Sequence, residues 1–200
     1  YIYLVMMQVG TAFLMAAYFI LAVNAGGFEF ARLSSIPLDQ TIQGVVFVFA
    51  FIGFATKAGL VPVHIWLPEA HPAAPSHISA LMSGVMIKSA VYGFSRVVLE
   101  FLPPVPLWCG VLVLVVAVIT CILAVLYALM ENNIKRLLAY SSIENMGIIF
   151  LALGTGLIFL SQFQSGLAAL AWMAGLFHVF NHGLFKGLLF LGSGAVIQGS

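Results

Sequence analysis

The sequence predicts an all-α polytopic transmembrane bundle with about six membrane-spanning helices. Hydrophobic residues make up 63% of the 200 positions and charged residues only 6%, and the mean hydropathy is +1.16. In an ordinary soluble domain about a quarter of the residues are charged. The apolar stretches run continuously for about 20 residues instead of alternating with period two, which favours helices over a transmembrane β-barrel. The formal net charge of +1 gives no reason to expect nucleic acid as a partner.

Short polar breaks separate the apolar spans. The NAGG turn ends the first span, a loop that reaches residue 41 and includes Pro37 follows it, and the segment EAHPAAPSH forms the loop before the third span. We interpret residues 1–200 as a single transmembrane domain and, because the chain starts without Met and stops directly after an apolar run, as a piece of a longer subunit. The six spans cover roughly residues 2–23, 42–68, 77–101, 106–130, 134–160 and 166–197.

Two of the spans are longer than a straight helix needs to cross a membrane. The span 42–68 would measure about 40 Å as one helix, against a hydrocarbon core of about 30 Å. Its glycines and prolines predict a discontinuity near Gly59 and Pro62. The sixth span covers about 32 residues, so we expect a kink near Gly183 or Gly187.

The distribution of basic residues predicts the orientation of the bundle. Lys135 and Arg136 flank the turn before the fifth span, which places that turn on the cytoplasmic side by the positive-inside rule. Counting spans then puts the 69–76 loop on the same side and the 24–41 and 102–105 loops outside. Arg32 and Arg96 oppose this count, because they lie at the ends that it places outside.

Four ionisable side chains lie inside apolar spans, and they are the first candidates for function: Lys57, Lys88, Glu144 and Lys186. A charge near the centre of a bilayer costs at least about 3 kcal/mol, so such residues usually face a bundle interior or a water path and serve ion or proton movement.

Lys57 lies near the middle of the second span, directly before the predicted break at Gly59 and Pro62. A broken helix exposes carbonyl groups and half-helix ends, the arrangement with which transporters line a hydrated cavity. The C-terminal end of the preceding half-helix also favours a cation. The alternative is a lysine in a static ion pair, but the coincidence of break and charge favours the cavity.

Lys88 lies close to the middle of the third span, with Ser83, Ser89 and Tyr92 as hydroxyl neighbours. At this depth a lysine cannot reach the interface by extending its side chain. A buried amine can gain or lose a proton when a charged partner moves. We interpret Lys88 as a proton-transfer group, with a structural role as the alternative.

The sixth span carries HVFNHGLFKG, in which His178, His182 and Lys186 follow each other at four-residue spacing. This spacing places all three within about 80° on one helix face. Because histidine can both give and receive a proton near neutral pH, the three resemble a proton relay. One alternative is a metal site, but no third ligand of obvious identity is present. The other alternative is that the histidines form structural hydrogen bonds.

Glu144 is the only carboxylate clearly within a span, so it can hold a proton, act as counter-ion to a lysine, or be a structural partner. His64, His71 and His77 cluster with Glu69 around the broken helix and its loop. They form either a water-accessible entrance for protons or simply an ordered loop.

Three motifs together resemble a known family: TKAGLVPVHIWLPEAHPAAPSHISALMSGVMIKSAVYG, NNIKRLLAYSSIENMGII and FHVFNHGLFKGLLFLGSGAV. They are similar to the antiporter-like membrane subunits of respiratory complex I, of multisubunit cation/proton antiporters and of membrane-bound hydrogenases. The resemblance covers about residues 40–198. It implies a larger subunit built from two inverted repeats, of which this chain spans parts of both.

The resemblance also implies roles for single residues. The lysine of the family's broken helix falls on Lys57 and that of the next helix on Lys88. The SSIENMG stretch, with Glu144, resembles the large membrane subunit of formate hydrogenlyase and hydrogenase-4 more than the subunits of complex I. The residues that the family's hydrophilic, proton-carrying axis would use are Lys57, Lys88, His178, His182 and Lys186, with Glu144 as a further proton-transfer group.

The implied function is proton conduction within an energy-coupling redox complex in a bacterial or archaeal cytoplasmic membrane. Such a subunit performs no redox chemistry itself; other membrane subunits and a peripheral hydrogenase or dehydrogenase arm are its partners and carry the iron–sulfur and nickel–iron centres. We therefore expect no cofactor and no metal in this chain. The alternatives are a subunit of a multisubunit Na⁺/H⁺ antiporter and a membrane anchor whose charges are inert.

Overall fold

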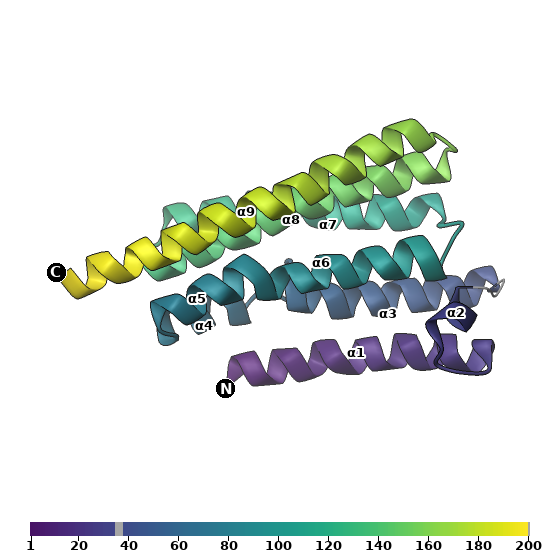
Figure 1. Ribbon diagram of the computed structural model, residues 1–200, viewed down its shortest axis with the longest axis horizontal. Helices are drawn as coiled ribbons and strands as arrows, with labels where there is room; N and C mark the ends of the chain where they lie inside the picture. The colour runs from purple at the N-terminus through teal and green to yellow at the C-terminus, as the bar shows by residue number, and fades with distance from the viewer. Residues whose placement is uncertain (35–37, 200) are drawn as a thin grey trace.

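The computed structural model describes residues 1–34 and 38–199, and the elements it assigns there are all helical. Six helical stretches are long and apolar enough to cross a membrane, which confirms the predicted fold class and number of spans. The ribbon shows them side by side, running alternately in opposite directions (Figure 1). The long single helices are α1 (Ile2–Ala25), α3 (Gln40–Ala58), α7 (Leu107–Leu129), α8 (Ile134–Ser161) and α9 (Ser165–Gly199).

The third span is helical throughout but not uniformly α-helical. It contains two π-helical turns, in which the backbone carries one more residue per turn than an α-helix and leaves carbonyl groups less regularly paired. The sequence did not predict these turns. In chain order the segments are α5 (Ser76–Leu81), η1 (Met82–Met86), α6 (Ile87–Arg96) and η2 (Val97–Phe101).

Several helix ends follow directly from their capping residues. Helix α1 ends at Gly26, whose φ of 69° is the left-handed conformation that glycine adopts readily, and this confirms the predicted turn. The Asp39 side chain accepts a hydrogen bond from the Thr41 backbone N–H at the start of α3. Asn133 does the same for the first turn of α8, bonding two backbone N–H groups.

The second span is broken where the sequence predicts it. Helix α3 ends at Ala58, Gly59 has a φ of 81°, and helical structure resumes only at Trp66 with α4 (Trp66–Ala73). The Trp66 indole donates a hydrogen bond of 2.8 Å to the Thr56 carbonyl. The Val61 N–H donates one of 3.1 Å to Thr120 Oγ1 on α7. Groups released by the break are thus satisfied from neighbouring elements, as a membrane interior requires.

The structure corrects two sequence-based expectations about loops. The EAHPAAPSH segment is not wholly a loop, because α4 continues through Glu69 to Ala73. Pro68 allows this, since it lies in the first helical turn, where a backbone N–H has no partner to lose. The loop between α1 and α3 contains the short helix α2 (Phe30–Leu33), and Pro37 lies outside the described residues.

Helix α9 does not show the interruption that its length suggested. It continues as one α-helix through Gly183 and Gly187, and the ribbon runs across the bundle at a slant (Figure 1). A tilt therefore accommodates length that the sequence analysis attributed to a kink.

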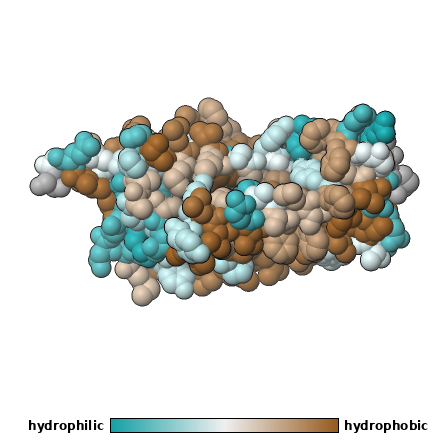
Figure 2. All heavy atoms as spheres, turned by 90° about the horizontal axis from the view of Figure 1, so that it is seen from below, coloured by the Kyte–Doolittle hydropathy of each residue, from teal (hydrophilic) through white to brown (hydrophobic). Residues whose placement is uncertain are grey.

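Contacts between loops fix which ends of the helices lie on the same side. Arg136 forms an ion pair of 2.8 Å with Glu69, and Lys135 Nζ donates to the Ala74 carbonyl at 2.8 Å. The loops around residues 69–76 and 131–136 therefore share one side, as predicted. Hydrophilic residues gather towards the two ends of the molecule and apolar residues between them (Figure 2), the pattern of a membrane-spanning bundle.

Candidate functional site

Lys57 lies in the last turn of α3, directly before the break, and its side chain is half-buried. Its Nζ donates a hydrogen bond of 3.1 Å to Thr11 Oγ1 on α1. Among the described residues it forms no ion pair, so the static pair considered from the sequence is not formed within this part of the chain. Lys57 thus faces α1, away from the other candidate lysines, which lie among α6, α8 and α9.

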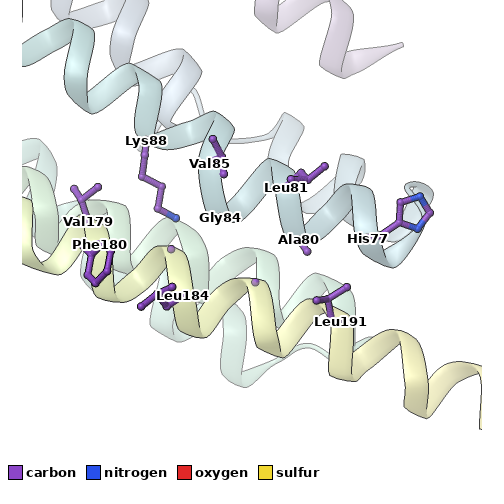
Figure 3. A pocket seen from close by; sticks show the side chains of 12 residues that line it. His77, Ala80, Leu81, Gly84, Val85, Lys88, Val179, Phe180, Leu184 and Leu191 are labelled. Atoms are coloured by element: carbon purple, nitrogen blue, oxygen red, sulfur yellow. The ribbon is translucent and has the colours of Figure 1, made fainter.

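Lys88 follows the π-helical turn η1 and is 8% exposed. Its Nζ donates to the carbonyl of Ser83, a residue of that turn. The irregular turn therefore supplies a backbone acceptor to a buried amine that has no carboxylate partner within the described ranges. In the close-up, the Lys88 amine points from α6 towards α9 (Figure 3).

A link of hydroxyl and carbonyl groups connects the surroundings of Lys88 to Lys186. The Ser83 and Ser142 hydroxyls are 2.7 Å apart and hydrogen-bonded, and Ser142 Oγ also donates to the Leu138 carbonyl at 2.9 Å. That same carbonyl accepts a hydrogen bond of 3.2 Å from Lys186 Nζ. Both serines are fully buried. Two buried lysines on different helices are thus joined through α8.

The predicted histidine and lysine ladder is present on one face of α9. The His178 and His182 rings are nearly parallel, at 8°, with centroids 6.3 Å apart. His178 Nε2 forms a hydrogen bond of 2.9 Å with Asn145 Oδ1 on α8. His182 is fully buried, and neither of its ring nitrogens has a hydrogen-bond partner among the described residues. Lys186, one turn further on, is 1% exposed.

The three histidines near the broken helix differ in environment. His77 is exposed, His64 is half-buried, and His71 is fully buried against Phe190 of α9, with ring centroids 4.5 Å apart. Burial lowers the pKa of His71 to about 4, assisted by the positive charges of Lys186 and Lys135. Burial also lowers the pKa of His64. His71 is therefore neutral at physiological pH and lies at the end of the ladder nearest the 69–76 loop.

Glu144 is half-buried, and its carboxylate makes no ion pair or hydrogen bond within residues 1–34 and 38–199. Its backbone carbonyl accepts a weak hydrogen bond of 3.6 Å from Cys121 of α7. Residues one or two positions apart on a helix do not share a face. Glu144 is consequently on a different face of α8 from Ser142 and Asn145, which contact the ladder.

The structure therefore groups five of the predicted residues and separates one. Lys88, His178, His182 and Lys186 meet at the contact of α6, α8 and α9, with Glu144 on the neighbouring face of α8, whereas Lys57 faces α1. Sequence reasoning noted Ser83 only as a hydroxyl neighbour of Lys88 and gave no role to Ser142 or Asn145. The signal for their role was present, because each is a hydrogen-bonding side chain inside an apolar span.

A groove runs along the same contact between α5, η1 and α9. Its volume is about 640 Å³, and its walls are apolar except for His77 at one end and Lys88 at the other (Figure 3). Within the described residues no three or more His, Cys, Asp or Glu side chains are arranged to hold a metal ion.

Comparison with known proteins identifies the family. A family model described as NADH:quinone oxidoreductase/Mrp antiporter, TM, matches residues 1–200. Hydrogenase-4 component B of Escherichia coli is 46% identical over 199 residues, which cover 98% of this chain and 30% of that protein. Formate hydrogenlyase subunit 3 of the same organism is 43% identical over 166 residues, covering 82% of this chain and 26% of that protein.

The fold matches solved structures of the same kind. A chain of respiratory complex I from Thermus thermophilus with bound NADH superposes with a TM-score of 0.85 at 26% identity, covering 99% of this chain and 40% of that chain. Compared with the two Escherichia coli relatives described above, the chain spans less than a third of their length. The six spans make it a multi-pass protein of the cytoplasmic membrane. It belongs to the NADH:quinone oxidoreductase/Mrp antiporter membrane family, and its resemblance to the hydrogenase-4 and formate hydrogenlyase proteins confirms the branch predicted from the Glu144 motif.

Proposed function

We propose that this chain is one membrane domain of a longer subunit that conducts protons for an energy-coupling redox complex of the hydrogenase-4 or formate hydrogenlyase type. The observation that carries the proposal is that two buried amines, Lys88 and Lys186, lie at one contact of three helices in an otherwise apolar bundle. Each donates to a backbone carbonyl, and the Ser83 and Ser142 hydroxyls are hydrogen-bonded between these two positions. Groups of this kind inside a membrane mark proton relays more often than scaffolding.

The absence of carboxylates from this link supports proton transfer. Two ammonium groups in one apolar core repel each other, and neither Lys88 nor Lys186 forms an ion pair within the described residues, although Glu144 is near enough to attract the charge of Lys186. Gain or loss of a proton at one lysine therefore changes the energy of the charge on the other. Such coupling allows a charge that moves elsewhere in a complex to drive protons through this bundle.

The histidine ladder supplies the remaining transfers. The ring centroids of His178 and His182 are 6.3 Å apart, a separation that a bridging water spans. Buried polar groups without a protein partner are the usual binding sites of internal water, and His182 offers two such nitrogens. We assign proton transfer to Lys88, His178, His182 and Lys186, with Lys57 and Glu144 as groups at the two flanks.

A cation/proton antiporter remains the second candidate, because the family description includes the Mrp antiporters. Sodium ions prefer oxygen ligands such as carboxylates and carbonyl groups. The α6, α8 and α9 contact has carbonyl and hydroxyl oxygens, but Lys88 and Lys186 already donate to two of the carbonyls, and two ammonium groups repel a further cation, which favours protons. Sodium-dependent proton flux in the absence of any redox partner would reverse this preference.

The relatives also suggest partners. Hydrogenase-4 component B and formate hydrogenlyase subunit 3 are named as parts of multisubunit enzymes. We infer that the present chain likewise assembles with other membrane subunits and with a peripheral redox arm that carries the iron–sulfur centres.

The proposal is tested with the full-length subunit in its assembled complex, reconstituted in vesicles. Replacing Lys88 by Met, or Lys57 by Met, is expected to lower proton movement per redox turnover by at least about tenfold while the complex still assembles. Lys135→Met is the matched control, because Lys135 lies at the membrane surface and its side chain bonds, within the described residues, only the Ala74 carbonyl. Unchanged pumping in both the Lys57 and the Lys88 variants would contradict the proposal.

A further inference from the structure

A second polar feature begins at Lys88 and runs along α6 in the direction away from the His71 end of the ladder. Lys88, Tyr92, Arg96 and Glu100 follow at four-residue spacing, so they lie along one side of the helix. We call these four residues the outer stripe. Twelve residues separate its ends, about 18 Å of helix, or a little more than half of a hydrocarbon core of about 30 Å. The stripe therefore connects the bundle centre to the membrane surface near the 102–105 loop.

The members of the outer stripe contact each other in sequence. Arg96 Nε forms an ion pair of 2.6 Å with Glu100, and Arg96 NH1 donates a hydrogen bond of 2.7 Å to the Tyr92 hydroxyl. The guanidinium also lies 5.7 Å from the centroid of the Tyr92 ring. The Arg96 and Glu100 side chains remain 40% and 42% exposed. The stripe is thus a connected series of polar contacts and not a set of separate side chains.

A cavity follows the outer stripe along its whole length. Its volume is about 210 Å³, and it is lined by all four stripe residues together with Ser95 and, from α9, Val179. At about 30 Å³ per water in the liquid, this is room for several waters. Lys88 and Val179 also line the larger groove that leads to His77 (Figure 3). Lys88 consequently stands between two grooves that open towards opposite ends of the bundle.

The two grooves differ in the chemistry of their walls. Between Lys88 and His77 the larger groove has only apolar lining, which does not organise a chain of water. The groove along the outer stripe presents a hydroxyl, a guanidinium and a carboxylate. In the second groove polar groups therefore follow one another between Val91, Leu99 and Leu176, whereas in the first they stand only at the two ends.

We propose that the outer stripe is the path by which a proton leaves Lys88 for the membrane surface near the 102–105 loop. The protonated Lys88 amine gives its proton to water in the groove and becomes neutral. The proton passes the Tyr92 hydroxyl, is accepted by the Glu100 carboxylate when its pair with Arg96 opens, and is released to bulk water, which restores the carboxylate. Lys88 regains a proton from the Lys186 side. This inference rests on the proposed function.

The test uses the assembled complex in vesicles and combines proton flux with water access. Ser95→Leu fills the groove without removing a charge, and Glu100→Gln removes the terminal acceptor; each is expected to lower proton flux per redox turnover about tenfold or more. Glu29→Gln is the matched control and is expected to leave flux unchanged. Glu29 is an exposed glutamate paired with an arginine three residues away, at 3.0 Å, at the same end of the bundle but outside the groove.

Water access is measured separately with Ser95→Cys in a chain whose Cys109 and Cys121 are replaced by alanine. A charged, membrane-impermeant thiol reagent is expected to modify this variant from the side of the 102–105 loop only, the side on which it modifies Glu29→Cys. Failure of the reagent to react from that side overturns the inference. So does normal flux in both Ser95→Leu and Glu100→Gln.

The two proposals fail in different ways. If Lys88→Met blocks flux while Ser95→Leu and Glu100→Gln do not, protons still use Lys88 and only the outer stripe is wrong. If Lys88→Met leaves flux unchanged, the proposed function itself fails.

Discussion

The two polar regions of the bundle differ in how their buried groups are satisfied. In the broken-helix region, which comprises the end of α3 and the turn to α4, the Thr56 carbonyl and the Val61 N–H both have partners from neighbouring elements. The ladder region comprises His178, His182 and Lys186 with their contacts. There, both ring nitrogens of His182 lack a hydrogen-bond partner within the described residues. In the break the backbone groups are paired and one side-chain nitrogen, His64 Nδ1, lacks a partner in the described residues, whereas in the ladder a whole imidazole is unpaired.

This difference distinguishes polar groups that stabilise the fold from polar groups that serve function. An unsatisfied buried donor or acceptor costs about 1–3 kcal/mol, so a protein retains it where the group serves something other than stability. A satisfied break is a means of shaping the backbone near Lys57. The comparison predicts that substitutions in the ladder change flux and not stability, while substitutions of the hydrogen-bonding groups that close the break, Lys57 excepted, change stability and not flux.

The largest effect is expected from His182→Leu. Leucine removes both unpartnered nitrogens and fills a similar volume, so the free energy of unfolding should stay level or rise. Proton flux through the assembled complex should fall at least about tenfold, because the middle group of the ladder can no longer exchange a proton. Flux is measured in vesicles and stability by thermal unfolding of the purified complex.

Trp172→Phe provides the comparison variant for His182→Leu. Trp172 lies on the same helix, is 8% exposed, and also carries a ring nitrogen without a partner in the described part of the chain. It is ten residues from His182, about 15 Å along α9, and no hydrogen bond or ring contact joins it to the ladder within the described residues. Flux should be unaffected. If the His182 variant conducts protons as well as the Trp172 variant does, the unpaired nitrogens of His182 have no role in proton transfer.

The sequence predicts the spans and the break well, but not the contacts that build the site. The continuous apolar runs are local signals that packing does not override. So is the position of Gly59 and Pro62 within a span that is longer than one membrane crossing requires. A π-helical turn has no comparable signal, since a single additional residue in an ordinary apolar helix produces it. The pairing of Ser83 with Ser142 depends on the register between α8 and the third span, which only tertiary packing sets. The same packing leaves Glu144 on a neighbouring face of α8, without an ion pair within the described residues.

A second, smaller effect is expected in the pH dependence of stability at the end of the ladder. The pKa of His71 is about 4 in the fold, against an ordinary value of 6.5. Between these values the unfolded chain binds the proton and the folded chain does not, so the free energy of unfolding falls as the pH falls from 6.5 towards 4. At pH 5 this loss amounts to about 2 kcal/mol.

His71→Phe tests this dependence, because phenylalanine preserves the ring stack on Phe190 and removes the titrating group. Thermal unfolding of the purified protein at pH 7.5 and pH 5 should show a smaller loss of stability in this variant than in the unmodified chain. His77→Phe should behave like the unmodified chain, since His77 is exposed. Equal losses in all three proteins would show that His71 is protonated in the fold.

The smallest effect is expected in the broken-helix region, from Thr120→Val. The substitution conserves volume but removes the hydroxyl that accepts the hydrogen bond of the Val61 N–H. Val61 is half-buried, so water can partly replace the lost acceptor, and the free energy of unfolding should fall by about 1 kcal/mol. Thr155→Val is the control, because that hydroxyl bonds only the carbonyl four residues before it on its own helix. Flux per assembled complex should be normal in both variants. A Thr120 variant that assembles and unfolds normally but conducts protons poorly would show that the hydrogen bonds of the break also serve proton transfer. That result would contradict the difference proposed between the two regions.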